Sequence, residues 1–362
     1  MKNIINKENM NDLECMLARK YEQKYAYFTG NGTTALYLIF KALNIQNKEV
    51  IFPNITCMAP VNSAIYAGYN VKFCDVNSND FTINIDSLKR QIEKGNVGIV
   101  VATHIYGNMC DMKSIYELCK SKAVMVIEDA AQTVEVTKYN DYAITSFGHT
   151  KLFETSKGGG VIFYNNSSYK EYFDYYSRNL KNESNSEEFK IYTDKYYNII
   201  KNFTEQQCFK KIKELQINSK EMFLRHFKEN KELYEVIKNK DNIVKGRLER
   251  ERLYKDNLLK ENFIFYRNRI KDNPLWRLTL LVENIERNLF VELVRKNNID
   301  ISTWYPCLHN FYNNQSDEEL KNSIYVSENL VNFWVTEKYE IDKIINDISK
   351  INDIVRGMTI NE

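Results

Sequence analysis

Short apolar segments alternate with helical patterns between about residue 25 and residue 165. Consecutive apolar residues bounded by polar ones predict strands that are buried on both faces. Six such strands are predicted, at 49–53, 71–76, 98–107 (running into a loop), 123–131, 142–148 and 161–165. Helices are predicted between them at 58–68, 85–94 and 112–122, with Gly68 and Asn84 as caps. This alternation indicates a mostly parallel sheet, whose ligands bind beyond the carboxyl ends of the strands.

The pattern changes after residue 166. Residues 166–197 are polar and rich in tyrosine, which predicts helix and loop, and 204–240 predict a long charged helical stretch. Further strands are predicted at 242–248, 262–267 and 276–282, and further helices at 287–298 and 339–355. The fold class is therefore expected to be α/β, with a large domain over residues 1–240 and a smaller α+β domain over 241–362.

Composition and charge exclude several classes of protein. The chain has 362 residues, of which 43% are hydrophobic and 27% charged, the balance of an ordinary globular protein. A formal net charge of +2 with dispersed lysines and arginines disfavours nucleic-acid binding. No segment is apolar enough to span a membrane and the N-terminus is too polar for a secretory signal, so a cytoplasmic protein is expected. Seven cysteines without a CxxC pair and four histidines without ligand spacing predict neither disulfides nor a metal site.

A glycine- and threonine-rich segment precedes the first apolar helix. Residues 30–36 read GNGTTAL, so that free backbone N–H groups are expected where the helix starts. Such groups, together with the helix dipole, bind phosphate. Taken alone, a glycine turn with a threonine cap is the better explanation, because such loops are common.

Two charged residues follow later strands of the predicted sheet. Asp129 ends the apolar run AVMVI, where a carboxylate is costly to bury without a cationic partner, although it could also cap the next helix. Lys151 follows the strand at 142–148, with Ser146 before it and glycines 158–160 after it. A lysine of this kind is usually a surface residue in a flexible loop. In combination, however, a phosphate cradle, an acid and an amine on one sheet edge match the three needs of pyridoxal 5'-phosphate (PLP).

Several motifs carry a resemblance to a known family. GNGTTAL resembles the motif SGTAAL, THIYGNMCDM resembles VHLYGxxADM, VIEDAAQ contains IEDAAQ, and SFGHTK resembles SFHxTK. These motifs are typical of the DegT/StrS family of PLP-dependent nucleotide-sugar aminotransferases. The likeness is close over residues 25–165 and looser over 275–310, where WRLTLLV and ISTWYPCLH resemble the family's C-terminal end. It implies the fold type I architecture of PLP-dependent transferases and a homodimer with sites at its interface.

The resemblance also implies an activity and roles for individual residues. The family transfers an amino group, with glutamate as the expected donor, to a keto-sugar in the biosynthesis of surface polysaccharides, glycans or antibiotic sugars. Lys151 would hold the PLP aldehyde covalently, Asp129 would pair with the pyridine nitrogen, and Gln132 would lie near the ring. The phosphate would be held by Gly32, Thr33, Thr34 and Ser146. His104, His149 and Tyr305 would border the substrate, although packing and turn-holding explain His104 equally well.

The chain departs from the family pattern at three places. Cys57 stands where the family has an aromatic residue that stacks on the cofactor ring, and Lys157 stands where the family has an acid. The GxNxR segment that reaches into the neighbouring subunit's site is not evident, and Asn198 is the candidate for its asparagine. These departures affect the expected substrate more than the expected cofactor.

Three alternatives to an aminotransferase remain open from the sequence. The first is another fold type I PLP enzyme that acts on a sugar or non-sugar carbonyl, such as a dehydratase. Some relatives in which histidine replaces the lysine are dehydratases, and the presence of Lys151 favours transamination over that reaction. A non-catalytic PLP-binding regulator is the second alternative. A nucleotide-binding oxidoreductase is the third, and the absence of GxGxxG after the first strand argues against it.

Overall fold

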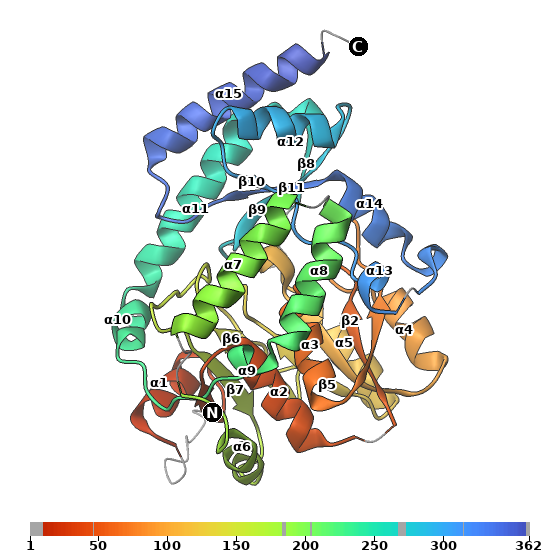
Figure 1. Ribbon diagram of the computed structural model, residues 1–362, viewed down its shortest axis with the longest axis vertical. Helices are drawn as coiled ribbons and strands as arrows, with labels where there is room; N and C mark the ends of the chain where they lie inside the picture. The colour runs from red at the N-terminus through yellow and green to blue at the C-terminus, as the bar shows by residue number, and fades with distance from the viewer. Residues whose placement is uncertain are drawn as a thin grey trace.

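The computed structural model describes residues 10–45, 47–182, 186–202, 205–266, 273–313 and 315–359. Two sheets organise these residues, and Figure 1 shows the larger one below the smaller one. No helix of this described part is long and apolar enough to cross a membrane.

Seven strands form the large sheet. They are β1 (Tyr25–Thr29), β2 (Glu49–Pro53), β3 (Asn70–Cys74), β4 (Val97–Thr103), β5 (Met125–Asp129), β6 (Tyr142–Ser146) and β7 (Gly160–Tyr164), in the order β1-β7-β6-β5-β4-β2-β3. All pairs from β3 to β6 are parallel, whereas β7 runs antiparallel to both β6 and β1. The prediction of a mostly parallel sheet is thus confirmed, and β1 is a strand that the pattern did not predict.

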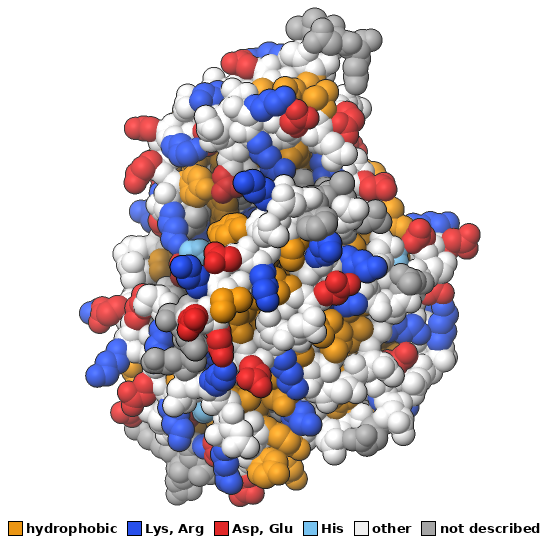
Figure 2. Space-filling view, viewed as in Figure 1, with side chains coloured by type: hydrophobic (Ala, Val, Ile, Leu, Met, Phe, Trp, Pro, Cys, Tyr) orange, Lys and Arg blue, Asp and Glu red, His pale blue; other side chains and the backbone are white. Residues whose placement is uncertain are grey.

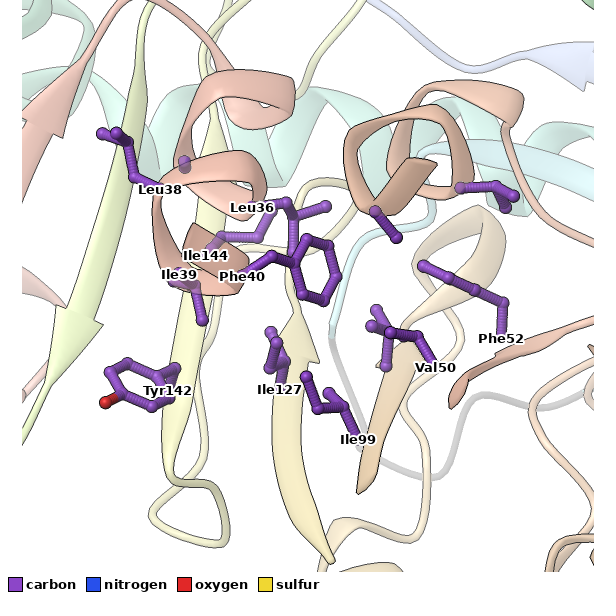
Figure 3. Close-up of a cluster of buried hydrophobic side chains, with 14 of the residues drawn as sticks. Leu36, Leu38, Ile39, Phe40, Val50, Phe52, Ile99, Ile127, Tyr142 and Ile144 are labelled. Atoms are coloured by element: carbon purple, nitrogen blue, oxygen red, sulfur yellow. The ribbon is translucent and has the colours of Figure 1, made fainter. Parts of the chain in front are cut away.

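Helices cover both faces of this sheet. They include α1 (Asp12–Lys20), α2 (Gly32–Leu43), α3 (Met58–Ala67), α4 (Ile85–Glu93), α5 (Met112–Ser121) and α6 (Tyr169–Ser177), with a short 3-10 turn at Ile105–Gly107. The three helices predicted in this region are confirmed. Asn84 caps α4 by accepting a hydrogen bond from the Ser87 N–H, and Gly68 ends α3 with a φ of 96°. Figure 3 shows Leu36, Ile39 and Phe40 of α2 packed on the apolar side chains of the strands, which fixes where α2 begins.

The stretch 204–240 is helical as predicted but interrupted. It contains α8 (Glu205–Asn218), α9 (Lys220–Phe223) and α10 (Glu232–Lys238), and it follows α7 (Ser186–Asn202). Between α9 and α10 the chain crosses the start of α2. There the Arg225 carbonyl accepts from the Gly30 N–H at 3.0 Å, and the Arg225 N–H donates to Thr34 Oγ1 at 2.9 Å. Backbone groups engaged in these bonds are not available to a helix, so the single long helix does not form.

The prediction of a strand at 242–248 is wrong. These residues belong to α11 (Lys240–Asn257), in which Arg247, Arg250 and Tyr254 are buried. Their spacing of three and four residues matches one face of a helix, and the many Arg, Lys, Glu and Leu residues favour that state. The apolar pair Ile243–Val244 suggested a strand only because a pair of residues is too short to show a period.

The small sheet is antiparallel, in the order β10-β11-β9-β8. Its strands are β8 (Phe263–Phe265), β9 (Arg277–Val282), β10 (Ile301–Ser302) and β11 (Leu330–Trp334), and 3-10 turns occur at Lys260–Asn262 and Asp317–Glu319. The accompanying helices are α12 (Arg287–Lys296), α13 (His309–Tyr312), α14 (Lys321–Asn329) and α15 (Ile341–Thr359). The predicted strands at 262–267 and 276–282 and the predicted helices at 287–298 and 339–355 are confirmed.

The segment between β10 and β11 returns to the large sheet. The His309 N–H donates to Asn54 Oδ1 at 2.9 Å, and the Ser323 N–H and hydroxyl donate to Asp75 Oδ1 at 2.7 and 2.6 Å. Part of the C-terminal sequence therefore packs on the strand ends of the large domain. The boundary after residue 240 coincides with the start of α11, and we retain it as a proposal.

Candidate active site

A cavity of about 440 Å³ lies where the start of α2, the ends of β5 and β6 and the small sheet meet. Residues from the large domain and from the region around β9 and β10 line it together. Of the residues that the sequence suggested, nine line this cavity: Gly32, Thr33, Cys57, Asp129, Gln132, Ser146, His149, Lys151 and Tyr305. Thr34, His104 and Asn198 are not among its lining residues.

The start of α2 forms one corner of the cavity. The first N–H groups of a helix have no partner within it, and the side chain of Asn31 caps only the Thr34 N–H, at 2.8 Å. A Cβ at Gly32 would stand 3.2 Å from the Cβ of Ser146 and 3.5 Å from its hydroxyl. Glycine therefore lets the strand end carrying Ser146 approach the helix start, and the two together form a corner suited to an anion.

The glycine run after the lysine loop brings β7 against the same corner. A Cβ at Gly160 would stand 2.3 Å from both the carbonyl carbon and the oxygen of Asn31, a distance that no side chain tolerates. Gly159 forms a parallel bridge with Asn31 and has a φ of 142°, which side chains rarely adopt. The close backbone approach expected of these glycines is thus observed, and it holds the turn before α2.

Thr34 serves the chain that crosses this corner. Its hydroxyl accepts from the Arg225 N–H at 2.9 Å and lies 3.4 Å from the Phe223 carbonyl, to which it donates. The structure thus places Thr34 behind the corner, while Thr33 and Gly32 face the cavity.

Asp129 ends β5 with its carboxylate buried. Oδ1 accepts from the Ala131 N–H at 3.0 Å, and the residue is 2% exposed. Burial raises the pKa of Asp129, although the Ala131 N–H and the charge of Lys151 lower it in part. A carboxylate in this position is short of positive charge and would be stabilised by a cationic group in the cavity.

Lys151 lies in a loop that both domains hold. Its Nζ stands 5.7 Å from the centroid of the Trp276 ring. The indole N–H of Trp276 donates to the Thr150 carbonyl at 2.6 Å, and the Thr150 N–H donates to Glu154 Oε2 at 3.0 Å. Thr150 itself has a φ of 71°, so these bonds hold a backbone shape that threonine does not favour. The direction of the Lys151 side chain thus depends on the small domain as well as on its own loop.

Cys57 lies at the N-terminal end of α3 and faces the cavity with a thiol. Burial raises the pKa of this thiol, while the nearby charge of Lys151 lowers it in part. A thiol offers no ring on which a cofactor could stack. The aromatic side chains that line the cavity come from elsewhere, namely Tyr196, Trp276, Trp304 and Tyr305.

His104 is fully buried and both of its ring nitrogens are engaged. Nδ1 accepts from the Cys110 N–H at 3.1 Å, so the proton is assigned to Nε2, which lies 2.8 Å from Glu128 Oε1. These bonds tie β4 to β5 and to the following loop. Such a placement corresponds to packing and turn-holding, and direct contact with a substrate would require His104 to move.

Gln132 connects the two domains across the cavity. Its Oε1 accepts from the Tyr106 N–H at 2.7 Å, and its Nε2 donates to the Tyr305 hydroxyl at 3.3 Å. The Tyr106 hydroxyl in turn donates to the Trp304 carbonyl and accepts from the Tyr305 N–H, both at 2.7 Å. The position of Tyr305 in the wall therefore follows from a buried hydrogen-bond chain.

His149 and Asn198 lie at exposed positions. The His149 side chain is 82% exposed at the rim, and its Nδ1 lies 2.8 Å from Glu154 Oε1. Glu154 also pairs with Lys338 of the small domain at 2.8 Å. Asn198 is exposed on α7, where its side-chain oxygen accepts from Asn202 Nδ2 at 2.7 Å. Its suggested role toward a neighbouring subunit stays a prediction.

Sequence reasoning missed several lining residues. Four of them lie within or beside the segments that resemble the family: Thr56, Trp276, Arg277 and Trp304. Their place next to those segments was the one sequence feature that could have identified them as site residues. Tyr196 lies on α7 in a polar, tyrosine-rich stretch that offered none. The Thr56 hydroxyl is buried in the cavity wall without a hydrogen-bond partner among the described residues. No cluster of three or more potential metal ligands occurs in the same described part of the chain.

Comparison with known proteins finds relatives whose names describe enzymes of nucleotide-linked amino sugars. A GDP-perosamine synthase of Vibrio cholerae is 32% identical over 157 residues, which are 41% of this chain and 42% of that protein. A UDP-4-amino-4,6-dideoxy-N-acetyl-beta-L-altrosamine transaminase of Campylobacter jejuni is 30% identical over 164 residues, 43% of each protein. The matched region thus spans about two fifths of the length of these curated relatives.

Solved structures show the fold. An aminotransferase from Psychrobacter cryohalolentis has a TM-score of 0.75 at 18% identity and covers 98% of this chain and 93% of its own. The PLP form of a putative sugar aminotransferase from Streptococcus pneumoniae has a TM-score of 0.74 at 15% identity, with 99% and 94% covered. The fold type I architecture is thereby confirmed. The model of the DegT/DnrJ/EryC1/StrS aminotransferase family matches residues 1–349, and the chain belongs to that family.

Proposed function

We propose that this protein is a PLP-dependent aminotransferase that moves an amino group, with glutamate as the donor, to a nucleotide-linked keto-sugar. One observation carries the proposal. Lys151, Asp129 and the corner formed by Ser146 with the start of α2 all line the same cavity. Family membership supports the same reaction class.

The residues of the cavity fit the cofactor. The helix start and the Ser146 hydroxyl would hold its phosphate, and the buried carboxylate of Asp129, whose pKa burial raises, would receive its protonated ring nitrogen. Lys151 would hold its aldehyde. When bound, PLP supplies an electron sink for the carbon that loses a proton.

Residues of the chain itself would transfer the proton and exclude water from the cavity. A neutral Lys151 Nζ would take the proton from the donor's α-carbon and deliver it to the carbon that carried the cofactor's aldehyde oxygen. The Thr150 bonds to Trp276 and Glu154 keep this amine in the cavity. The rings of Trp276, Trp304 and Tyr305 line the opposite wall, which keeps water from the reacting atoms.

A spectrum of the purified protein with added PLP tests the proposal. We expect the visible band of a lysine-bound PLP, its loss when glutamate is added, and its return with a suitable keto-sugar. Lys151→Ala should abolish both the band and amino transfer. Lys113→Ala, at an exposed position on α5, is the matched control and should behave as the unaltered protein. A Lys151→Ala protein that still transfers amino groups would refute the assignment.

Product analysis separates the competing functions. A sugar dehydratase would release water from the sugar without consuming glutamate. A non-catalytic regulator would show the lysine-bound band but no change with any amine. The names of the relatives, which specify GDP- and UDP-linked amino sugars, support nucleotide-linked keto-sugars as the compounds to try first.

We also propose a homodimer located in the cytoplasm. Large apolar side chains are exposed on α6 and α7, among them Tyr175 (63%), Tyr197 (64%) and Phe189 (54%). Figure 2 shows hydrophobic side chains among charged ones on the face where these helices lie in Figure 1. Asn198 lies on the same exposed helix, which suits contact with a partner. A monomeric mass by light scattering would contradict the dimer, and seven free thiols support a reducing compartment.

A further inference from the structure

Arg277 is a cation in the cavity wall that forms no ion pair with any described residue. It begins β9 and lines the cavity together with Lys151. Its Nη1 donates to Asn332 Oδ1 at 2.8 Å, and this amide oxygen carries no net charge. Its Nε is buried and has no hydrogen-bond partner among the described residues. Arg277 as a whole is half-buried, and a guanidinium withdrawn from water in this way is costly unless an anion pairs with it.

Two tryptophans hold the guanidinium in place. Its central carbon lies 4.5 Å from the centroid of the Trp276 ring and 3.7 Å from that of Trp334. Stacking on aromatic rings leaves the edge of the planar group free to form hydrogen bonds. Arg277 is therefore preorganised, and an incoming anion would not have to order a flexible side chain.

Asp300 acts on this cation through its charge but forms no ion pair with it. Asp300 raises the pKa of Arg277 through its charge, but its Oδ2 accepts from the Trp334 indole at 2.8 Å and from the Tyr339 hydroxyl at 2.9 Å. No described carboxylate lies within ion-pair distance of Arg277. The dominant effect on the group is burial, which lowers its pKa. Among the described residues, the wall thus holds a positive charge without an ion-pair partner.

We propose that Arg277 binds a carboxylate of the amino donor. A guanidinium matches a carboxylate with two parallel hydrogen bonds, and the guanidinium of Arg277, which lines the cavity, has an Nε without a partner among the described residues. Lys151 Nζ and the Arg277 guanidinium both lie over the ring of Trp276, at 5.7 and 4.5 Å from its centroid. In an amino acid the carboxylate is bonded directly to the carbon whose proton the lysine would take, so the two groups suit one small substrate.

A diphosphate of a nucleotide-linked sugar is the other anion that the reaction would bring. The cavity of about 440 Å³ must also contain the cofactor, and a sugar would place its diphosphate beyond the sugar ring, toward the outside. Arg277, stacked between two indoles in the same cavity as the lysine, fits the smaller anion better. The inference rests on the proposed function, because it assigns the donor to the same cavity.

The experiment measures binding of 2-oxoglutarate to the protein with added PLP, followed by the fluorescence of the tryptophans that enclose Arg277. We expect Arg277→Gln to raise the dissociation constant at least about tenfold, equivalent to about 1.4 kcal/mol. Arg356→Gln, an exposed arginine on α15, is the matched control and should leave the constant unchanged. Inorganic pyrophosphate forms the second arm, and its binding should not respond to Arg277→Gln.

Kinetics give an independent readout. The KM for glutamate should rise in Arg277→Gln, while the KM for the keto-sugar and the visible band of lysine-bound PLP stay unchanged. Arg277→Lys keeps the charge but loses the planar fork, so we expect a smaller loss of 2-oxoglutarate binding than in Arg277→Gln. If Arg277→Gln does not fold, Arg277→Lys provides the test.

The two proposals fail in different ways. If the unaltered protein forms no lysine-bound band, the proposed function is wrong. If the band and amino transfer are intact but both Arg277 variants bind 2-oxoglutarate like the unaltered protein, only the carboxylate site is wrong. Weaker pyrophosphate binding with unchanged 2-oxoglutarate binding would likewise overturn it and would assign Arg277 to the diphosphate.

Discussion

The two walls of the cavity are built on different physical principles. The large-domain wall consists of strand ends and a helix start, where Asp129, Ser146 and Gly32 take their positions from backbone geometry. The small-domain wall consists of stacked rings and one guanidinium. The rings of Trp276 and Tyr305 are nearly parallel, with an interplanar angle of 8° and 6.2 Å between their centroids. The first wall offers charges and N–H groups to a cofactor. The second offers apolar surface and a single cation, which are the means to select a substrate.

The largest effect is expected from the large-domain wall. Asp129→Asn removes the buried negative charge and leaves the shape of the wall, so the cofactor's ring nitrogen would lose its counter-ion. We expect amino transfer to fall by about a hundredfold or more. The measurement is a single-turnover rate with glutamate, and Asp111→Asn, at the cap of α5 away from the cavity, is the control. An Asn variant of full activity would show that Asp129 does not serve the ring.

Gly160→Ala tests whether the large-domain wall depends on close backbone packing. The added Cβ would stand 2.3 Å from Asn31 backbone atoms, so β7 or the start of α2 must shift. We expect a loss of about 1–3 kcal/mol in the free energy of unfolding and weaker phosphate binding. Gly357→Ala on α15 meets no atom within 4 Å and should not destabilise the protein. Equal stability of the two variants in urea would contradict the tight contact.

Trp276→Phe tests how far the small-domain wall supports the lysine of the other wall. The substitution keeps a ring but removes the hydrogen bond to the Thr150 carbonyl. Since such a bond contributes about 1 kcal/mol, we expect about a fivefold loss in the rate of amino transfer with the lysine-bound band retained. Trp334→Phe leaves the Thr150 bond intact and provides the comparison. An unchanged rate in Trp276→Phe would show that Glu154 alone holds the loop.

His226 should make the stability of the segment that supports the large-domain wall depend on pH. It lies on the chain that crosses the start of α2, its ring stacks on Tyr27, and burial lowers its pKa from 6.5 to about 4. The unfolded chain therefore binds the proton first, and stability is lost as the pH falls from about 6.5 toward about 4. We expect His226→Phe to reduce the fall in Tm over this range, measured by thermal melts at successive pH values. A fall of the same size in both proteins would exclude His226 as its source.

The smallest effect is expected at the rim. The His149 side chain is 82% exposed and touches Glu154, which Lys338 and the Thr150 N–H also contact. We expect His149→Ala to change kcat/KM less than about twofold, because an exposed ion pair contributes little. A loss of tenfold or more, measured with both substrates, would place His149 in the substrate site after all.

The contrast between the walls also explains what could be read from the sequence. The residues of the large-domain wall lie directly after apolar runs, and strand ends in a parallel sheet share one edge, so their convergence was predictable. The resemblance of the GNGTTAL motif implied that Thr33 and Thr34 both hold the phosphate, but one position along a helix turns a side chain by about 100°, and only Thr33 lines the cavity. His104 likewise shares a motif with the site while its side chain points to Glu128.

The small-domain wall was far less predictable. Trp276 lies more than a hundred residues from the lysine loop that it contacts, and no local period in the sequence reports such a pairing. The interruption after α9 has the same origin, since the hydrogen bonds of Arg225 with the distant start of α2 outweigh the local helical preference there.

The sequence by itself determined the parallel sheet, the order of its chemical groups and the family, because buried strands and glycine turns impose short, regular patterns. Only the tertiary structure decided which side chains face the cavity. It placed Arg277 between two indoles with no ion-pair partner among the described residues, left Thr34 and His104 out of the cavity lining, and brought aromatic residues from distant segments into that lining. Such outcomes depend on packing between segments far apart in the chain, and the free energy of packing is not encoded in any short stretch of residues.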